Sequence, residues 1–283
     1  YVENGYAIGI DIGTTTLAIS LVGMQSKNLL HTYTAINRQR AYGADVITRL
    51  AAAGNGKLAE LTECIQKDLI AGIDDIIEKT GIDKDRIEKI AIAGNTTMGH
   101  LLRGYSCKTL GIYPFTPVSI KAAELSFAEV FASDYLKTPV IMLPGISTFV
   151  GADIVAGLLQ CEYDRTEGIN LFLDLGTNGE LAIGNKDRII VSSTAAGPAF
   201  EGGNISCGIG SIAGAICHFD LAENPNYRTI GDKAPVGICG SGVIELMSEL
   251  VKAGLVDETG LLKEEYFEVG YPVARAFDGG DIV

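Results

Sequence analysis

The sequence predicts an α/β protein built from two similarly folded halves with a ligand cleft between them. Its length of 283 residues corresponds to about two domains of about 150 residues. Hydrophobic residues make up 47% and charged residues 20%, which is typical of a globular chain. An internal repeat brings the stretch Ile10–Thr14 back as Leu173–Thr177, and each copy is followed by Leu-Ala-Ile. One copy per half indicates two related lobes, residues 1–143 and 144–283.

The first half reads as strands followed by amphipathic helices. Short apolar runs that end at glycine or at polar turns indicate buried strands, and apolar residues three and four apart indicate helices. The expected strands are 6–12, 16–22, 29–36 and 87–93, and the expected helices are 44–53, 57–80 and 96–102. The run Gly54-Asn55-Gly56 is expected to separate the first two helices.

The second half repeats this mixture with more glycine. After a strand at 137–143 that ends the first lobe, the expected strands are 170–175, 181–184 and 188–192, and the expected helices are 148–159 and 241–253. The helix at 148–159 carries small residues, so another element or a ligand can approach it closely. We therefore expect a cleft between the halves to be the ligand site.

The charge balance excludes some partners. The chain has 22 Lys and Arg against 35 Asp and Glu, a net charge of −13, which predicts no nucleic-acid binding and no docking on anionic membranes. It has no run of 18 apolar residues, so no membrane span is expected. Any phosphate ligand would have to be bound by backbone N–H groups, hydroxyls and a metal ion.

The six cysteines are spaced too widely for a cluster site. No CxxC pair occurs, so a zinc or iron–sulfur site within this chain is not expected. Free thiols in a reducing compartment favour a cytoplasmic protein. Because the chain begins at Tyr1 rather than Met, we expect it to be a piece of a longer protein.

Each copy of the repeat places an aspartate near the end of a strand and a tight polar turn after it. Asp11 precedes the first turn and Asp174 the second. The turns consist of Gly13, Thr14, Thr15 and Thr16, and of Gly176, Thr177, Asn178 and Gly179. Glycine lets backbone approach a ligand, and the N–H groups of such turns bind anions. Two facing turns would grip a polyphosphate, and the two carboxylates would hold Mg²⁺ together with water and phosphate oxygens.

Four further features are candidates for the same site. Asp153 either orients an attacking water or is a charge favoured at a helix N-terminus. Asn95 is either a wall of the cleft or a helix cap. Glu201 is a nucleotide contact near ribose or Mg²⁺, part of a groove that faces a protein partner, or a solvated loop carboxylate. Gly240, Ser241 and Gly242 open a helix that would pass adenine and ribose closely.

These motifs resemble those of the actin, Hsp70 and sugar-kinase superfamily of ATP-binding proteins. Asp11–Thr16 resembles its first phosphate motif, Asp174–Gly179 its second, and Gly237–Gly242 its adenosine motif. Thr148–Gly157 lies where the first connecting helix of that superfamily is expected. The resemblance implies two RNase H-like lobes with ATP and Mg²⁺ in the cleft, and it covers nearly the whole chain.

A narrower resemblance is to the ATPase domain of the reductive activators of corrinoid proteins. It rests on Ala41–Ile47, Gly94–Met98, Phe149–Asp153, Asp174–Glu180, Thr194–Gly202, Cys207-Gly208 and Gly237–Gly242. In that family, ATP binding or hydrolysis is coupled to electron transfer that reduces a Co(II) corrinoid protein to Co(I). The electron enters through an iron–sulfur domain elsewhere in the same polypeptide.

For this chain the resemblance implies an ATPase coupled to electron transfer, with a Co(II) corrinoid protein as partner. The catalytic roles would fall on Asp11, Asp174 and Asp153. An electron donor would act through the iron–sulfur domain, and the cluster is expected only in that domain, which this chain lacks. The sequence leaves the oligomeric state undecided, and a homodimer is compatible with it.

Three rival functions share the fold. A small-molecule kinase would need a Gly-x-Asp-Gln-Gly type motif, which the sequence lacks. An activator of 2-hydroxyacyl-CoA dehydratases would carry cluster-ligating cysteines within this fold. An actin-like or Hsp70-like module would use the nucleotide only to switch a binding surface.

Overall fold

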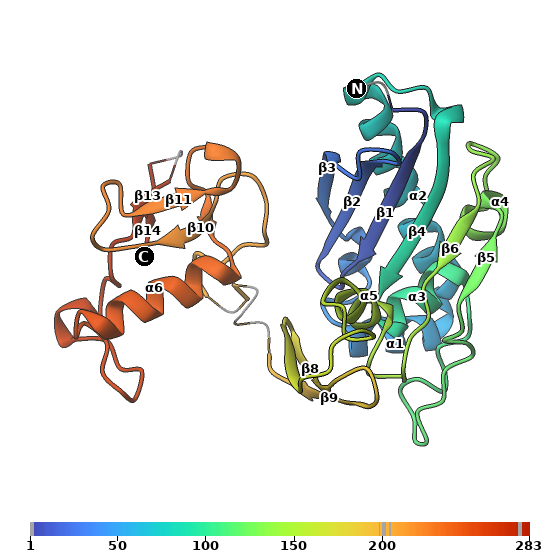
Figure 1. The fold of residues 1–283 in the computed structure, drawn as a ribbon. Coiled ribbons are helices and arrows are strands. Elements are labelled where there is room, and N and C mark those ends of the chain that lie inside the picture. Colours follow the sequence, from blue (N-terminus) through green and yellow to red (C-terminus); the bar gives the residue numbers. More distant parts are fainter. Residues whose placement is uncertain (1–2, 198, 200–201, 204, 277–278) are drawn as a thin grey trace. The chain divides into compact units, whose positions relative to one another are not determined.

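A computed structural model describes residues 3–197, 199, 202–203, 205–276 and 279–283. The chain divides into two compact units (Figure 1), one of residues 1–172 and 180–193 and one of residues 173–179 and 194–283. The lobe boundary expected after residue 143 stays a prediction.

The first unit contains a six-stranded mixed sheet in the order β3-β2-β1-β4-β6-β5 (Figure 1). Its strands are β1 (Tyr6–Ile12), β2 (Thr16–Gly23), β3 (Leu29–Ile36), β4 (Ile87–Gly94), β5 (Ala123–Leu125) and β6 (Val140–Met142). Strands β1, β2 and β3 form an antiparallel meander, whereas β1, β4 and β6 run parallel and β5 is an antiparallel edge. This mixed α/β arrangement confirms the predicted fold class.

The predicted helices of this part of the chain occur in the predicted order, and one further helix, Phe127–Phe131, was not expected. They are α1 (Val46–Ala52), α2 (Leu58–Thr80), α3 (Thr96–Arg103), α4 (Phe127–Phe131) and α5 (Ala152–Gln160), and short 3₁₀ turns occur at Arg38–Ala41 and Lys84–Arg86. The expected break between the first two helices is a π-helical turn at Ala53–Lys57, in which Gly56 adopts a φ of 89°. Glycine reaches this left-handed conformation without steric cost, which explains the interruption.

The core of the first unit follows from two periodicities. Strand β2 buries alternate residues, Leu17, Ile19 and Leu21. Helix α2 buries residues three and four apart, including Leu61, Ile65, Leu69, Ile73 and Ile76. Gly72 lets the helix pack tightly on the sheet, because a Cβ there would lie 2.5 Å from the Ile19 side chain. The first strands and the long helix therefore form one hydrophobic core.

The remaining strands form smaller sheets. Strands β7 (Asn170–Leu175), β8 (Asn178–Gly184) and β9 (Ile189–Ala195) pair in that order. In the second unit, β10 (Ala215–Phe219) lies between β11 (Tyr227–Thr229) and β12 (Gly237–Ile238), and β13 (Ala274–Arg275) pairs with β14 (Asp281–Ile282). Helix α6 (Gly240–Lys252) contacts β10 (Figure 1).

Two sequence expectations differ in detail from the structure. The helix expected at 148–159 begins at Ala152, because the amides of Ile146 and Ser147 both donate to the Val150 carbonyl and form a turn there. Strands β10 to β14 lack a strong apolar alternation and were not expected. Within the described residues, no helix combines the length and apolar character needed to cross a bilayer.

Candidate nucleotide-binding site

The turn between β1 and β2 has the tight geometry that its glycine predicts. The Gly13 amide donates to the Thr16 carbonyl over 3.0 Å. A Cβ at Gly13 would lie 2.5 Å from that same oxygen, which is too close for any other residue. The sequence therefore fixes this turn sterically, at the end of the strand that carries Asp11.

Three successive carbonyls of this first loop are bound by the protein interior. The Gly13 carbonyl accepts from Asn37 Nδ2 at 2.9 Å and the Thr15 carbonyl from the Asn37 amide at 2.9 Å. The Thr14 carbonyl accepts from Arg49 Nη2 at 2.6 Å. In a trans peptide the N–H points opposite to the C=O. The amides of residues 14, 15 and 16 are therefore directed away from these partners, as an anion-binding turn requires.

Arg49 supplies a buried positive charge behind the loop. Its side chain is fully buried and also donates from Nε to the Gly43 carbonyl at 2.9 Å. Burial lowers the pKa of Arg49 to about 10, so the guanidinium remains charged at neutral pH. A cation in low-dielectric surroundings attracts a bound anion more strongly than one in water.

Asn95 links the loop to the end of β4. Its side-chain oxygen accepts from the Met98 amide at 3.0 Å and caps α3, while its Nδ2 donates to Thr14 Oγ1 at 3.0 Å. The helix-cap role considered from the sequence is confirmed, and the opposite end of the same side chain binds the first loop; the role as a cleft wall stays a prediction.

Asp153 lies in the first turn of α5, next to Asn95. A Cβ at Gly151 would lie 2.5 Å from the Asn95 Cα and 2.8 Å from Asp153 Oδ1, so Gly151 is packed between these two residues. Asp153 Oδ1 also accepts from the Ile154 amide at 2.8 Å. Asp11 lies on β1 opposite Ala93 of β4. The first loop, Asn95 and Asp153 therefore form one connected cluster.

The second loop joins β7 to β8. The Gly176 amide donates to the Asn178 carbonyl at 2.9 Å, and the Gly197 amide donates to the Thr177 carbonyl at 2.9 Å. Gly179 is buried. Loss of solvation raises the pKa of the Asp174 carboxyl above its ordinary value.

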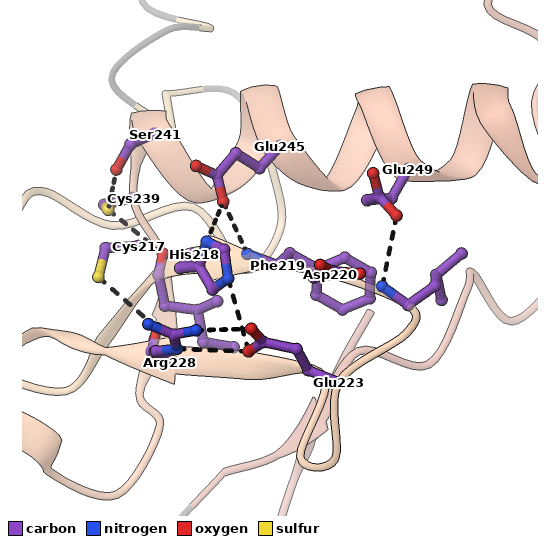
Figure 2. Close-up of polar contacts among 12 residues, drawn as sticks. Cys217, His218, Phe219, Asp220, Glu223, Arg228, Cys239, Ser241, Glu245 and Glu249 are labelled. Atoms are coloured by element: carbon purple, nitrogen blue, oxygen red, sulfur yellow. Dashed lines mark hydrogen bonds and ion pairs between the residues drawn. The ribbon is translucent and has the colours of Figure 1, made fainter.

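The predicted adenosine segment opens α6 (Figure 2). Gly240 and Gly242 are buried, and a Cβ at Gly242 would collide with the Ile216 carbonyl of β10. Cys239 is the residue before the helix, and its Sγ lies 3.3 Å from Ser241 Oγ. Glycine at these positions lets the helix start directly on the strand. The predicted contact Glu201 lies outside the described residues.

A polar clamp holds α6 to the same strand (Figure 2). Glu245 of α6 lies 2.7 Å from His218 Nδ1 and accepts from the Phe219 amide at 2.9 Å. His218 Nε2 is 3.6 Å from Glu223, which pairs with Arg228 at 2.6 Å. The clamp orients the helix whose first turn is the predicted adenosine segment.

The donor set for a metal is limited. Over the described ranges of the chain, no group of three or more His, Cys, Asp and Glu side chains is placed to hold a metal ion. Mg²⁺ normally takes only one or two protein carboxylates and completes its shell with water and phosphate. The assignment of Asp11 and Asp174 as Mg²⁺ ligands stays a prediction.

Arg49 and Asn37 were not predicted from the sequence. Helix α1 buries Arg49 and leaves Ile47 exposed at 70%, which is the reverse of the usual amphipathic pattern. A charged residue among apolar ones normally indicates a solvent-facing position. A sequence feature that bears on the position of Arg49 is Asp45, which caps the N-terminus of α1 and places Arg49 one turn into the helix.

Comparison with known proteins identifies the family. The profile of the RACo middle region matches residues 6–166, and that of the C-terminal domain of RACo, described as the ASKHA domain, matches residues 168–271. A solved structure, the reductive activator for corrinoid,iron-sulfur protein, superposes with a TM-score of 0.88 at 32% identity and covers 100% of this chain and 48% of that one.

Curated relatives give consistent names. The corrinoid activation enzyme RamQ of Eubacterium limosum is 37% identical over 90% of this chain and 43% of its own length. The [Co(II) methylated amine-specific corrinoid protein] reductase of Methanosarcina barkeri is 28% identical over 89% of this chain and 52% of its own length. The chain spans about half the length of these relatives, and it belongs to the RACo family of reductive activators of corrinoid proteins, with an ATPase fold of the actin, Hsp70 and sugar-kinase superfamily.

Proposed function

We propose that this chain is the ATP-binding and ATP-hydrolysing part of a reductive activator, which drives the reduction of a Co(II) corrinoid in a methyl-transfer protein to Co(I). The observation that carries the proposal is the first loop, whose three carbonyls are bound from behind by Asn37 and Arg49. The names of the relatives support the corrinoid partner.

In this proposal the phosphates of ATP contact both loops. The amides of residues 14–16, the threonine hydroxyls and the turn at residues 176–179 would bind them. Gly240, Ser241 and Gly242 would pass the adenosine, with Glu201 near the ribose or the metal. Asp11 and Asp174 would hold Mg²⁺, which supplies neutralisation of the phosphate charge.

Hydrolysis would use Asp153. Its carboxylate, in the first turn of α5 and near Asn95 across Gly151, would orient a water for attack on the terminal phosphate. The products would be ADP, phosphate and a proton. Asn95 would hold the Thr14 hydroxyl in place during the step.

Coupling to electron transfer requires two conformations. Nucleotide binding can change the affinity for the corrinoid partner only if the nucleotide-bound closed form and the open form bind that partner with different affinity. The electron would come from a donor through an iron–sulfur domain of the longer polypeptide. Reduction of Co(II) to Co(I) consumes one electron and would follow closure on ATP.

The test measures ATP binding by calorimetry and phosphate release, with Mg²⁺, for the chain alone and with a Co(II) corrinoid protein. We expect saturable ATP binding and faster turnover with the corrinoid protein. Asp11→Asn and Asp174→Asn should each weaken Mg²⁺-dependent ATP binding at least tenfold. Asp187→Asn, in the turn between β8 and β9, is the matched control and should bind as the unchanged chain does.

Three results would contradict the proposal or part of it. Absence of nucleotide binding would remove the two-loop site altogether. Stimulation by a sugar or a short carboxylic acid, with a phosphorylated product, would instead assign a small-molecule kinase. Tight binding with turnover that no corrinoid protein alters would overturn the coupling while leaving the nucleotide site intact.

A further inference from the structure

The first unit contains a cavity whose lining includes Asn95 but otherwise consists of residues that the proposed function does not use. It lies at the carboxyl ends of β4 and β6, against one face of α3, and has a volume of about 70 Å³. Apolar side chains line much of it, including Ile92, Met142 and Leu143. In α/β sheets, ligands bind at this edge of the parallel strands, and small-molecule sites combine an apolar lining with a few polar groups.

The charges around the cavity have one sign. Arg103 and Lys121 line it, and none of its described lining residues is Asp or Glu, although the chain carries a net charge of −13. His100 adds no charge. Its Nδ1 lies 2.8 Å from the Thr96 carbonyl and its Nε2 accepts from the Val118 amide at 2.9 Å, which is the neutral tautomer. Burial lowers the pKa of His100 in agreement with this state.

Arg103 has an unused donor. Its Nε is buried and has no hydrogen-bond partner within the described part of the chain. Nη1 donates to the Glu129 carbonyl over a long 3.4 Å, and the guanidinium lies 5.5 Å from the Tyr105 ring centroid. A buried, unsatisfied N–H of a charged group is costly, and a guanidinium presents a fork that matches a carboxylate.

We propose that this cavity binds a small aliphatic carboxylate, with its carbon chain on the apolar lining and its carboxylate on Arg103, assisted by Lys121. One water needs about 10–15 Å³ of such space, so the cavity accommodates about five non-hydrogen atoms. Propionate has this size. The inference goes beyond the proposed function and does not depend on it.

Gly99 offers a way to fill the cavity without damaging the fold. It lines the cavity from α3, and a Cβ added there meets no atom within 4 Å. Alanine is also a better helix former than glycine. Gly99→Ala should therefore fold as the unchanged chain does, and Gly99→Leu should occupy the space of the ligand.

The experiment titrates the whole 283-residue chain with propionate, followed by amide NMR shifts of the cavity residues. We expect saturable binding that propionamide, the neutral isostere, does not reproduce within tenfold. Arg103→Met should weaken propionate binding at least tenfold, and Gly99→Leu should abolish it. Arg86→Met, at the other end of β4, is the matched control and should leave it unchanged.

Three outcomes would overturn the assignment. Equal binding of propionate and propionamide would remove the role of the charge. Unchanged binding in a folded Gly99→Leu variant would place the ligand elsewhere. If inorganic phosphate binds the cavity more tightly than propionate, the cavity is an oxyanion site and its apolar lining does not contribute to ligand recognition. Nucleotide binding, measured separately, tests the proposed function and is independent of all three.

Discussion

The two copies of the Asp-Gly-Thr repeat have almost the same sequence and different surroundings. Strand β1 before the first loop buries Ile8, Ile10 and Ile12 to 3% exposure or less. Strand β7 before the second loop leaves Leu171, Leu173 and Leu175 exposed at 60%, 53% and 48%. The first loop is bound by buried side chains, whereas backbone bonds at Gly176 and Gly197 outline the second. The repeated motif thus predicts that the turn is repeated, but it does not predict which groups bind the turn.

We expect the largest loss of stability when the first loop loses the buried side chain of Arg49, which binds one of its carbonyls. Arg49→Met leaves the carbonyls of Thr14 and Gly43 buried without a donor, so the free energy of unfolding should fall by about 3 kcal/mol. Urea denaturation followed by circular dichroism measures this. Arg188→Met, on the exposed turn between β8 and β9, should change stability by less than about 0.5 kcal/mol. A loss below about 1 kcal/mol for Arg49→Met would mean that the loop does not depend on this cation.

A second change compares the two loops directly. A Cβ at Gly13 would lie 2.5 Å from a carbonyl oxygen, whereas one at Gly179 would meet the Thr194 side chain at an ordinary 3.4 Å. Gly13→Ala should therefore cost about 2 kcal/mol of stability, and Gly179→Ala should be close to neutral. Thermal unfolding of both variants in parallel measures the difference. Equal losses would show that the two turns are equally constrained.

A third change tests the link between Asn95 and the first loop. Asn95→Asp keeps an oxygen that caps α3 but removes the Nδ2 donor to Thr14 and adds a negative charge beside the proposed phosphate site. ATP affinity should fall about tenfold, which is about 1.4 kcal/mol, with little change in unfolding. Calorimetry with ATP and Mg²⁺ decides this. Asn95→Ala, which loses the cap as well, should lose stability by about 1 kcal/mol.

The smallest effect concerns Asp174 and has a defined sign. Loss of solvation raises its folded-state pKa, so the folded form binds the proton more tightly than the unfolded form. The associated stability is fully present below the unfolded pKa of about 3.8 and disappears as pH rises through the folded pKa. Without nucleotide, Asp174→Asn should therefore be slightly more stable than the unchanged chain at pH 7, and this gain should disappear near pH 4. Unfolding curves across this range measure it, and a loss of stability at pH 7 would contradict it.

The sequence predicts the elements whose periodicity is strong. Strand Leu29–Ile36 and the C-terminal end of α2 at Thr80 coincide with the structure, and β1 agrees at both ends. These segments are long or bounded by glycine. Strands such as β12, with two residues, have no periodicity to detect, and their pairing depends on segments far away in the chain.

The candidate site was predictable only in part. Local motifs indicate the two turns and the start of α6, because glycine and threonine at fixed spacing have a direct steric and hydrogen-bonding meaning. The roles of Asn37 and Arg49 depend on the packing of α1 and of the 3₁₀ turn after β3 against the loop, and that packing is a long-range property. The double use of Asn95 also required the position of Thr14, which lies 81 residues earlier.

The burial of Arg49 makes this side chain observable. Guanidinium protons on a surface exchange with water too fast to give sharp signals at neutral pH, whereas those enclosed and bonded to the carbonyls of Gly43 and Thr14 are protected. The Nε–H of Arg49 should therefore give a resolved resonance in an otherwise uncrowded spectral region. Its frequency would report, without any attached label, each time the first loop takes up or releases a ligand.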